Sequence, residues 1–520
     1  MMRFVPAWYN PDRPWYSTDN VWFRSIAETN SDDTVTQLRI FRQSGEDVEV
    51  VVLSYAPSLR RFLHSQSIFD VPYWSFFDAV QGLDDDYTRP LDFLTLEWPE
   101  DVSFHYNPFL VTVMRGDEVY ARIHLAREGT LQSVRYYGDG MPTLERIFDD
   151  RGFLSSVLMH GEDGRPLTQY YLSRAGDVIL SEDVPSGSID IVQNPDGRFR
   201  RSSYDGWEDL IGEFLGDHLG GRGGRDTVVL ALSGQHNDLV ASVLSDQMLV
   251  LSRSTTRPAI ASAQLLDRTG AVFTDVGQSS EREATDEAIE HAQLPVLSIY
   301  PLERRQTFGA SANEAVVYIS LFVDSMTTDE LDYAIAVMAP QLVHERTVLL
   351  VCTFRSQDVD YLEGVRRVIA GYQHLDRGLL DEEAGLGVDL GLAEEPEEKI
   401  QLAFLDREAD LLRTMARSRV FIDLGAKVNP HLAAEAVNAG VPQISRHEHA
   451  LCIHPLNGYV IGDDSELAAA LDYFLSGLEH WNQSLVQCRV LGELFSAQEV
   501  LGRWDLVKEG AADAGPADRA

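Results

Sequence analysis

The sequence lacks the features of a membrane-spanning, secreted or metal-binding protein. It has three cysteines, Cys352, Cys452 and Cys488, with no CxxC pair and no histidine at zinc-binding spacing, so we expect reduced core residues and no metal. No apolar run is long enough to span a bilayer, and the first residues, MMRFVPAWYNPDRPWY, lack the apolar core of a secretory signal. We therefore expect a cytoplasmic protein, and peripheral attachment to the inner face of the membrane through a partner stays open.

Basic residues are scarce as well. The chain has 43 Lys and Arg against 82 Asp and Glu, which gives a formal net charge of −39. Such a field repels phosphate backbones and anionic membrane surfaces, so we expect no nucleic-acid partner and no direct membrane insertion. A general selection for solubility would produce the same charge, so the acidity by itself identifies no partner.

The order of strand and helix patterns predicts an α/β protein with more than one core. The chain has 520 residues, of which 44% are hydrophobic. The run VEVVVL at 48–53 is typical of a buried parallel strand, and VVLAL at 228–232 and MLVL at 248–251 resume this pattern. Between them, alternating segments such as LVTVM and EVYARIHL, separated by GD, GDG and EDG turns, predict an antiparallel β insert.

These patterns define the domains that we expect. A discontinuous first Rossmann-like lobe covers residues 1–90 and 200–310, and an extended β insert covers 91–199. A second series of strands, VVYISLFV, RTVLLVC and RVFIDL, predicts a second Rossmann-like lobe at 311–505. The small polar residues at 506–520 predict a disordered tail.

Residues 418–445, SRVFIDLGAKVNPHLAAEAVNAGVPQIS, predict a strand, a loop, a helix and a second strand. Asn429 can cap the helix, and Pro430 suits its first turn, where a missing N–H costs nothing. Gly440 is the left-handed stop, and Pro442 prevents continuation of the helix. Such a unit places the helix N-terminus at the carboxyl edge of the sheet, where ligands bind in open α/β folds. We expect a pocket near Asn429, although any βαβ crossover shares this geometry.

The pattern AAEAVNAGVPQIS, followed by NGYVI at 457–461, is similar to the nucleotide-sugar donor lobe of glycosyltransferases with two facing Rossmann-like domains. The resemblance places Glu435 where a helical glutamate of that family contacts the donor's nucleotide. Eight residues earlier that family usually has a second glutamate, but this chain has Lys427. The family also has a basic pair after the first strand of the lobe, where this chain has FVDSM. After the second strand of the unit it has a glycine pair and a glutamate, where this chain has SRHEHALC. A leaving diphosphate needs positive charge, and the basic pair that would supply it is missing. The resemblance therefore implies a vestigial donor cleft without catalysis, formed by Lys427, Asn429 and Glu435.

Further motifs resemble one family over nearly the whole chain. They are PAWYNPDRPWY at 6–16, WFR at 22–24, DDTVTQLRIF at 32–41, GEDVEVVVLSYAPSLRRFLHSQ at 45–66, VPYWSFFDAVQ at 71–81 and LDYFLSGLEHWNQSLV at 471–486. They are similar to the first of the accessory secretory proteins of the accessory Sec system. The resemblance implies a glycosyltransferase-like (GT-B) subunit that has no catalytic set and no cofactor. It also implies a hetero-complex with the second and third accessory secretory proteins, one of them an acetyltransferase, that supports export of glycosylated serine-rich adhesins by a motor ATPase.

Three other features allow two interpretations each. Trp8, Tyr9 and Trp15 lie in an aromatic cluster that could contact a partner or a glycan, or could be ordinary packing. His236 in SGQHND could be a base, but no Ser or Cys at a recognisable spacing supports this, so a loop or capping role is expected. The acidic stretches at 84–87 and 381–398 are typical of solvated turns and loops.

Three functions are therefore compared. The first is an interaction subunit that has lost catalysis. The second is an active glycosyltransferase that uses Glu435 and Lys427 in an unusual donor site, and the third is a glycan-binding module. Binding of a nucleotide-sugar donor separates the second from the others.

Overall fold

The computed structural model describes most of the chain, in two compact units. One unit consists of Met1–Ser25, Phe41–Val250 and Ala261–Thr269, and the other of Ile26–Ile40, Leu251–Ile260 and Gly270–Ala520. The described residues are 1–10, 12–17, 32–84, 87–107, 110–126, 129–220, 226–245, 247–254, 257, 261–274, 296–298, 307–343, 346–356, 358–375, 398–405, 408–426 and 428–508.

A seven-stranded sheet forms the first Rossmann-like lobe. Its strand β1 (Met2–Val5) lies between β2 (Val48–Val52) and β14 (Thr227–Ala231) and is parallel to both. The order β17-β16-β15-β14-β1-β2-β3 contains the 3-2-1-4-5-6 arrangement of a doubly wound fold. Its remaining elements are β3 (Tyr73–Ser75), β15 (Met248–Arg253), β16 (Thr269–Thr274), β17 (Val296–Ser298), α1 (Asp33–Ser44), α2 (Leu59–Ser65), α3 (Phe76–Gln81), α4 (Trp207–Gly220), α5 (Asn237–Val243) and α6 (Ala263–Leu266).

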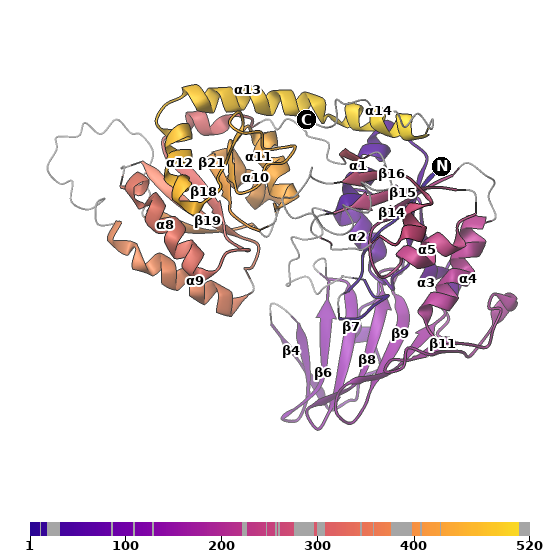
Figure 1. Ribbon diagram of the computed structural model, residues 1–520. Helices are drawn as coiled ribbons and strands as arrows, with labels where there is room; N and C mark the ends of the chain where they lie inside the picture. Colours follow the sequence, from indigo (N-terminus) through magenta and orange to yellow (C-terminus); the bar gives the residue numbers. More distant parts are fainter. Residues whose placement is uncertain are drawn as a thin grey trace. The chain divides into compact units, whose positions relative to one another are not determined.

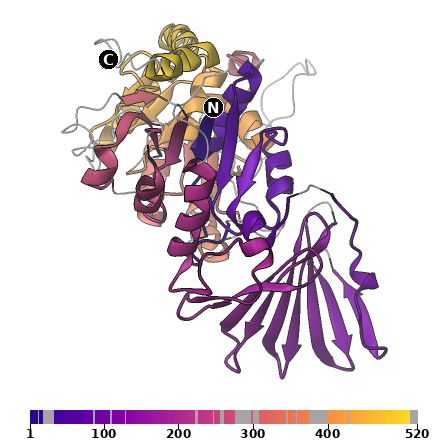
Figure 2. The ribbon, with the colours of Figure 1, turned by 90° about the vertical axis from the view of Figure 1, so that its right-hand side faces the viewer.

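An antiparallel sheet of ten strands is inserted between α3 and α4 (Figure 1). Each strand pairs with its neighbour in the sequence, from β4 at one edge to β13 at the other, and Figure 2 shows them as one broad, twisted layer. The strands are β4 (Val102–Tyr106), β5 (Val111–Arg115), β6 (Glu118–Leu125), β7 (Leu131–Gly138), β8 (Met141–Asp149), β9 (Phe153–His160), β10 (Pro166–Leu172), β11 (Val178–Asp183), β12 (Ile189–Ile191) and β13 (Ser203–Tyr204).

A six-stranded parallel sheet forms the second lobe, in the order β20-β19-β18-β21-β22-β23. All residues of β19 are buried, as expected of a parallel strand covered on both faces. Helices α8, α9 and α12 supply the core of one face, and α10 and α11 supply that of the other. The elements are β18 (Val317–Phe322), β19 (Thr347–Thr353), β20 (Ile400–Phe404), β21 (Ser418–Asp423), β22 (Gln443–Ser445), β23 (Gly458–Val460), α8 (Thr328–Leu342), α9 (Val359–Gly371), α10 (Glu408–Arg417), α11 (Pro430–Ala439), α12 (Leu467–Leu475), α13 (Glu479–Leu494) and α14 (Ala497–Lys508).

This topology confirms the predicted fold class of two Rossmann-like lobes with an antiparallel β domain inserted in the first.

The three cysteines are free and buried, as predicted, and burial raises the pKa of each thiol to about 12. Helix α14 continues to Lys508 because Val507 is buried, so the first three residues of the predicted tail are helical. Residues 509–520 and nearly all of the predicted loop at 381–398 lie outside the described residues.

Buried charges join the turn between β8 and β9, in the middle of the insert, to the first lobe. Arg60 of α2 contacts the carboxylates of Asp78, Asp149 and Asp150 at 3.1, 3.0 and 2.6 Å. Arg151 contacts Asp149 and Asp78, both at 2.8 Å. Because Asp149 ends strand β8 while Arg60 and Asp78 lie on helices of the first lobe, this ion network holds the β8–β9 turn of the insert against the lobe.

A second network holds strand β11 of the insert. The carboxylate of Glu182, on β11, accepts hydrogen bonds from Trp207 Nε1 at 3.0 Å, the Tyr171 hydroxyl at 3.0 Å and Arg13 Nη2 at 3.2 Å. The hydroxyl of Tyr16 lies 2.6 Å from that of Tyr171. Glu182 is buried, and each of its three donors comes from a different segment, so one carboxylate ties the N-terminal segment and α4 to the insert.

We expect Arg60→Ala to destabilise the first unit strongly. The change leaves three carboxylates facing Arg151 alone, and removing one member of a buried ion pair costs about 3 kcal/mol or more. Urea unfolding followed by tryptophan fluorescence measures this loss.

Arg115→Ala is the matched control for Arg60→Ala. Arg115 bonds Asp101 at 2.7 Å within the same unit, but both side chains are more than half exposed, so solvent screens the pair. The control should unfold at the wild-type urea concentration. An Arg60→Ala midpoint equal to that of the control would contradict a structural role for the ion network.

The ion network also makes stability depend on pH. Burial raises the pKa of Asp150 to about 6, because it outweighs the opposing effect of Arg60, and the negative charge of Asp149 adds to the rise. A carboxyl group whose pKa is higher in the folded state contributes stability that is complete below its unfolded pKa of about 4. That stability is lost as the pH rises through about 6. We therefore expect the urea midpoint to fall between pH 5 and pH 7 by less in Asp150→Asn than in the wild type; equal slopes would contradict this assignment.

Candidate functional site

The strand–loop–helix unit at 418–445 forms as the sequence predicts. Strand β21 ends at Asp423, helix α11 begins at Pro430, and Gly440 ends it with a φ of 74°. The carboxylate of Asp423 accepts hydrogen bonds from the backbone N–H groups of Gly425 at 3.0 Å and Asn429 at 3.1 Å. Asp423 therefore shapes the loop that leads from the carboxyl edge of the sheet into the helix.

The N-terminus of α11 is capped by its own chain. The amide oxygen of Asn429 accepts hydrogen bonds from the N–H groups of His431 at 3.1 Å and Leu432 at 3.2 Å. A free helix N-terminus binds anions through such N–H groups. In this chain the cap occupies two of them, which lowers the capacity of this end of the helix for a phosphate.

Glu435 lies on α11 and is 5% exposed. Its Oε1 accepts a hydrogen bond from Asn438 Nδ2 at 3.2 Å. The third residue of the predicted donor cleft, Lys427, lies outside the described residues. The structure thus places Asn429 at the cap and Glu435 inside the lobe, six residues further along the helix.

Two carboxylates mark the carboxyl edge of this sheet. Strands β18 and β21 are neighbours, and Phe322 pairs with Asp423. Asp324 follows β18 and accepts hydrogen bonds from the hydroxyl of Thr353 and from the N–H of Phe354, the latter at 3.0 Å. Burial raises the pKa of Asp423, and the negative charge of Asp324 raises it further. This effect of Asp324 on Asp423 indicates that the two carboxylates lie near each other at this edge.

The arginines described on the neighbouring loops are already engaged with acidic partners. Arg446 makes a two-pronged ion pair with Asp464 at 2.7 and 2.8 Å. Arg355 bonds Asp358 and lies over the ring of Tyr361, 3.9 Å from its centroid. Attracting a diphosphate to this edge would require breaking these pairs, because the nearest loop carboxylates repel it.

In the sequence, FVDSM stands out only because it lacks a basic pair. The signal for the acidic edge is nevertheless local, since FVD at 322–324 and FID at 421–423 both place an aspartate at the end of a buried strand. Because the carboxyl ends of adjacent parallel strands meet at one edge, two such endings predict neighbouring carboxylates.

The N-terminal aromatic residues pack within the first unit. Trp8 is 6% exposed, with its ring 4.8 Å from that of Phe62, and Trp15 is 2% exposed and donates from Nε1 to Glu208 at 2.9 Å. Tyr9 is half-buried, and its hydroxyl lies 2.6 Å from Nδ1 of His236. The rings of Trp8 and Trp15 therefore offer little surface to a ligand, and Tyr9 retains the most.

His236 occupies the N-cap position of α5, in agreement with the predicted loop or capping role. Its Nε2 lies 2.7 Å from the carbonyl oxygen of Ala231, so this nitrogen must carry a proton, and Nδ1 shares a hydrogen bond with the Tyr9 hydroxyl. Both ring nitrogens are thus engaged, and the imidazole is 1% exposed. This arrangement serves structure rather than proton transfer.

The described part of the chain contains neither a cluster of metal ligands nor a helix that could span a membrane. No three His, Cys, Asp or Glu side chains among these residues come together as metal ligands would. Among the same residues, every helix is too short or too polar to cross a bilayer.

The sequence matches one family model and full-length relatives. The model of the accessory Sec system protein family of accessory secretory protein 1 matches residues 1–510. The accessory Sec system protein of this family from Streptococcus gordonii is 27% identical, over 97% of this chain and 98% of that protein. The protein of the same name from Staphylococcus aureus is 25% identical, over 99% and 100% of the two chains.

Solved structures are similar over the same length. A chain of the Glycosylation Associate Protein (Gap123) complex from Streptococcus agalactiae has a TM-score of 0.81 and 25% identity, over 98% of this chain and all of that chain. A chain in the structure of accessory secretory protein 1, 2 and 3 of Streptococcus pneumoniae has a TM-score of 0.79 and 24% identity, over 99% and 100%.

The GT-B fold is also shown by a glycosyltransferase. The pneumococcal O-GlcNAc transferase GtfA, solved with UDP and GlcNAc, has a TM-score of 0.64 at 12% identity, over 98% of this chain and 99% of that chain. The two Rossmann-like sheets, the inserted β sheet and the match over residues 1–510 together confirm the predicted resemblance. The chain belongs to the accessory Sec system protein family of accessory secretory protein 1.

Proposed function

We propose that this chain is a non-catalytic subunit that assembles with two other accessory secretory proteins. The observation that carries the proposal is its full-length likeness, with a TM-score of 0.81, to a chain solved within the Gap123 complex. The similar pneumococcal structure is titled for accessory secretory proteins 1, 2 and 3 together. A likeness that spans the whole chain supports a shared assembly better than a match confined to one lobe.

The absence of glycosyl transfer is supported by the electrostatics of the second lobe. A donor's diphosphate gains negative charge as the sugar leaves, and an enzyme compensates it with arginine, lysine, a metal or helix N–H groups. Here the described edge presents Asp324 and Asp423, and Asn429 occupies N–H groups of the helix. In our proposal Lys427, Asn429 and Glu435 mark a vestigial donor cleft that no longer performs transfer.

The family assignment supports a role in protein export. In our proposal the complex acts on the cytoplasmic side of the membrane, holds glycosylated serine-rich adhesin and delivers it to the motor ATPase of the accessory Sec system. Tyr9 is half-buried and is a candidate contact for such a partner, and the ring of Trp15 supports it from within. Trp8, packed on Phe62, is a weaker candidate.

We expect nucleotide sugars to leave the melting temperature unchanged. A ligand present at 100 times its Kd adds about 2.7 kcal/mol to the stability of the state that it binds, which a thermal-shift assay detects. UDP, UDP-glucose and UDP-N-acetylglucosamine at millimolar concentration are suitable probes, and an active two-lobed glycosyltransferase serves as the positive control. The physical reason is the acidic edge described above.

Glu435→Gln is the matched variant for this assay, since an amide oxygen can still accept from Asn438. It should behave as the wild type with every nucleotide. A shift that appears in the wild type and is lost in Glu435→Gln would instead revive an active donor site.

We expect this chain, co-expressed with the second and third accessory secretory proteins of its source, to elute from size-exclusion chromatography as one stable complex. Its purified form alone should show no transfer of sugar from a nucleotide donor to adhesin polypeptide. A chain that stays monomeric when the two other proteins are present would remove the basis of the interaction-subunit proposal, and robust transfer would overturn its non-catalytic part.

A further inference from the structure

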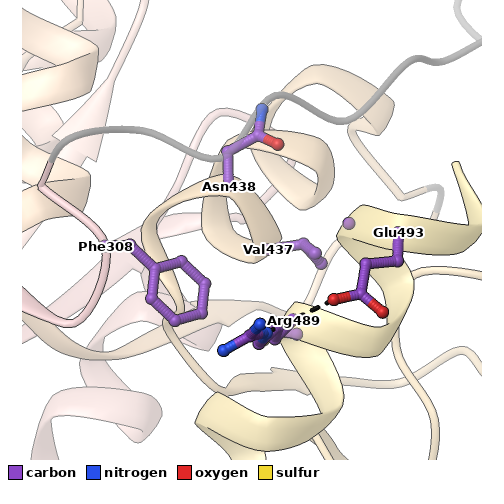
Figure 3. Close-up of a pocket in the computed structure, with 7 residues that line it drawn as sticks. Phe308, Val437, Asn438, Arg489 and Glu493 are labelled. Carbon is purple, nitrogen blue, oxygen red and sulfur yellow. Dashed lines mark hydrogen bonds and ion pairs between the residues drawn. The ribbon is translucent and has the colours of Figure 1, made fainter. Parts of the chain in front are cut away.

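A pocket lies on the second unit between helices α11 and α13. Its volume is about 110 Å³, and it is lined by Phe308, Val437, Asn438, Cys488, Arg489, Gly492 and Glu493. Figure 3 shows Phe308 on one side of it, Val437 and Asn438 on α11, and Arg489 and Glu493 on α13. The pocket is separate from the cap of α11, because its residues on that helix belong to the last turn.

Asn438 gives the pocket a buried hydrogen-bond acceptor. Its side chain is 5% exposed, and its Oδ1 has no donor among the described residues. The orientation of the amide follows from chemistry, since Nδ2 lies 3.2 Å from Oε1 of Glu435. The amide nitrogen thus donates to Glu435, and the amide oxygen is left for another donor. A buried acceptor without a donor costs free energy, and a ligand that supplies one recovers it.

The other walls of the pocket favour an aromatic ring. Phe308, Val437 and Cys488 are apolar, and burial raises the pKa of the Cys488 thiol to about 12, which keeps it neutral. An apolar cavity of roughly 150 Å³ binds benzene. This pocket is smaller, at about 110 Å³, but it is not closed, so a six-membered ring can enter it while its attachment point stays in the mouth. Arg489 and Glu493, with side chains 64% and 72% exposed and 3.3 Å apart, form the charged mouth. A phenol ring attached to its chain opposite the hydroxyl matches this order. The hydroxyl would meet the acceptor of Asn438, the ring would meet the apolar walls, and the attachment point would lie at the charged mouth.

The surface beside the pocket is apolar. Val486, Val490 and Leu494 of α13 are 65%, 41% and 52% exposed and recur every four residues, which places them along one face of the helix. We call these three residues the stripe. Arg489 at the pocket mouth follows Val486 by three positions, and Glu493 follows Val490 by three, so the pocket and the stripe form one continuous surface. Aromatic anchors in pockets surrounded by apolar contacts are typical of the energetic centre of protein interfaces.

We propose that this pocket binds a tyrosine side chain of a partner protein, with the phenol O–H donating to Oδ1 of Asn438 and the ring packed against Phe308 and Val437. The stripe Val486, Val490 and Leu494 covers the polypeptide on either side of that tyrosine. The identity of the partner as one of the two accessory secretory proteins rests on the proposed function, whereas the chemistry of the pocket does not.

The first test uses p-cresol, which is the tyrosine side chain as a free molecule, and p-xylene, in which a methyl group replaces the hydroxyl. Saturation-transfer NMR with titration of the purified chain measures both affinities. We expect p-cresol to bind about tenfold more tightly, because p-xylene leaves Oδ1 of Asn438 without a donor. Equal affinity for the two, or binding of neither, would overturn the proposal.

Two variants locate the binding. A Cβ at Gly492 or at Gly502 would meet no atom within 4 Å, but only Gly492 lines the pocket. Gly492→Leu should fill the pocket and abolish p-cresol binding, whereas Gly502→Leu, on α14, should bind it as the wild type does. Both should melt no lower than the wild type, since leucine is the better helix former. Asn438→Leu should keep apolar binding and lose the preference for p-cresol, a change that a purely structural role of Asn438 would not produce.

The second test is assembly with the two accessory secretory proteins. Gly492→Leu should weaken the complex at least tenfold, and Gly502→Leu should leave its affinity unchanged, as measured by calorimetry. If Gly492→Leu assembles normally, the docking proposal falls while the interaction-subunit function stands. If even the wild-type chain fails to assemble, the proposed function falls, and the p-cresol titration still decides the chemistry of the pocket.

Discussion

The pairing of β1 with β14 is the constraint on which the first unit depends. Met2 lies opposite Thr227, so the chain must travel through more than two hundred residues and return to the strand where it began. Arg3 makes that return specific. It is fully buried within β1 and bonds Glu49 at 2.9 Å and Asp226 at 2.8 Å, at the start of β14. Burial alone would raise the pKa of Glu49, but hydrogen bonds from His218 and Arg3 outweigh it and lower that pKa. Glu49 thus contacts both Arg3, at the centre of the sheet, and His218 of helix α4, and so connects that helix to the sheet.

This closure explains why the insert needs two polar networks. A ten-stranded sheet attached only by its two ends would be free to tilt, because it shares no strand with the parallel sheet. The Arg60 network restrains the end of β8, and Glu182 restrains β11. Buried ion pairs contribute little net stability, since desolvation offsets their attraction, but a mispaired arrangement would leave charges buried without partners. We interpret both networks as devices that select one orientation of the insert.

The parts that could be predicted from the sequence are those that local chemistry decides. The cap at Asn429, the first turn at Pro430 and the left-handed stop at Gly440 each depend on one residue and its immediate backbone, and all three were correctly placed. The order of strands followed from periodicity in the same way. Burial of Trp8 and Trp15 depends instead on Phe62 and Glu208, which are distant in the sequence and supply no local signal. The pocket behind Asn438 was missed for the same reason, because its second wall is α13, about fifty residues further along the chain.

Helix α11 shows how a glycosyltransferase-like lobe can exchange one kind of site for another. In a donor lobe the useful end of such a helix is its N-terminus, where free N–H groups face the carboxyl edge of the sheet. Here Asn429 closes that end, and Asp324 and Asp423 make the edge acidic. Glu435 instead orients Asn438, which lines the pocket beside α13, nine residues and roughly 14 Å along the helix from the cap. In our proposal the hydrogen-bonding group of α11 that serves a ligand lies in the last turn of the helix, where it suits another protein, rather than in the first turn, where it would suit a nucleotide.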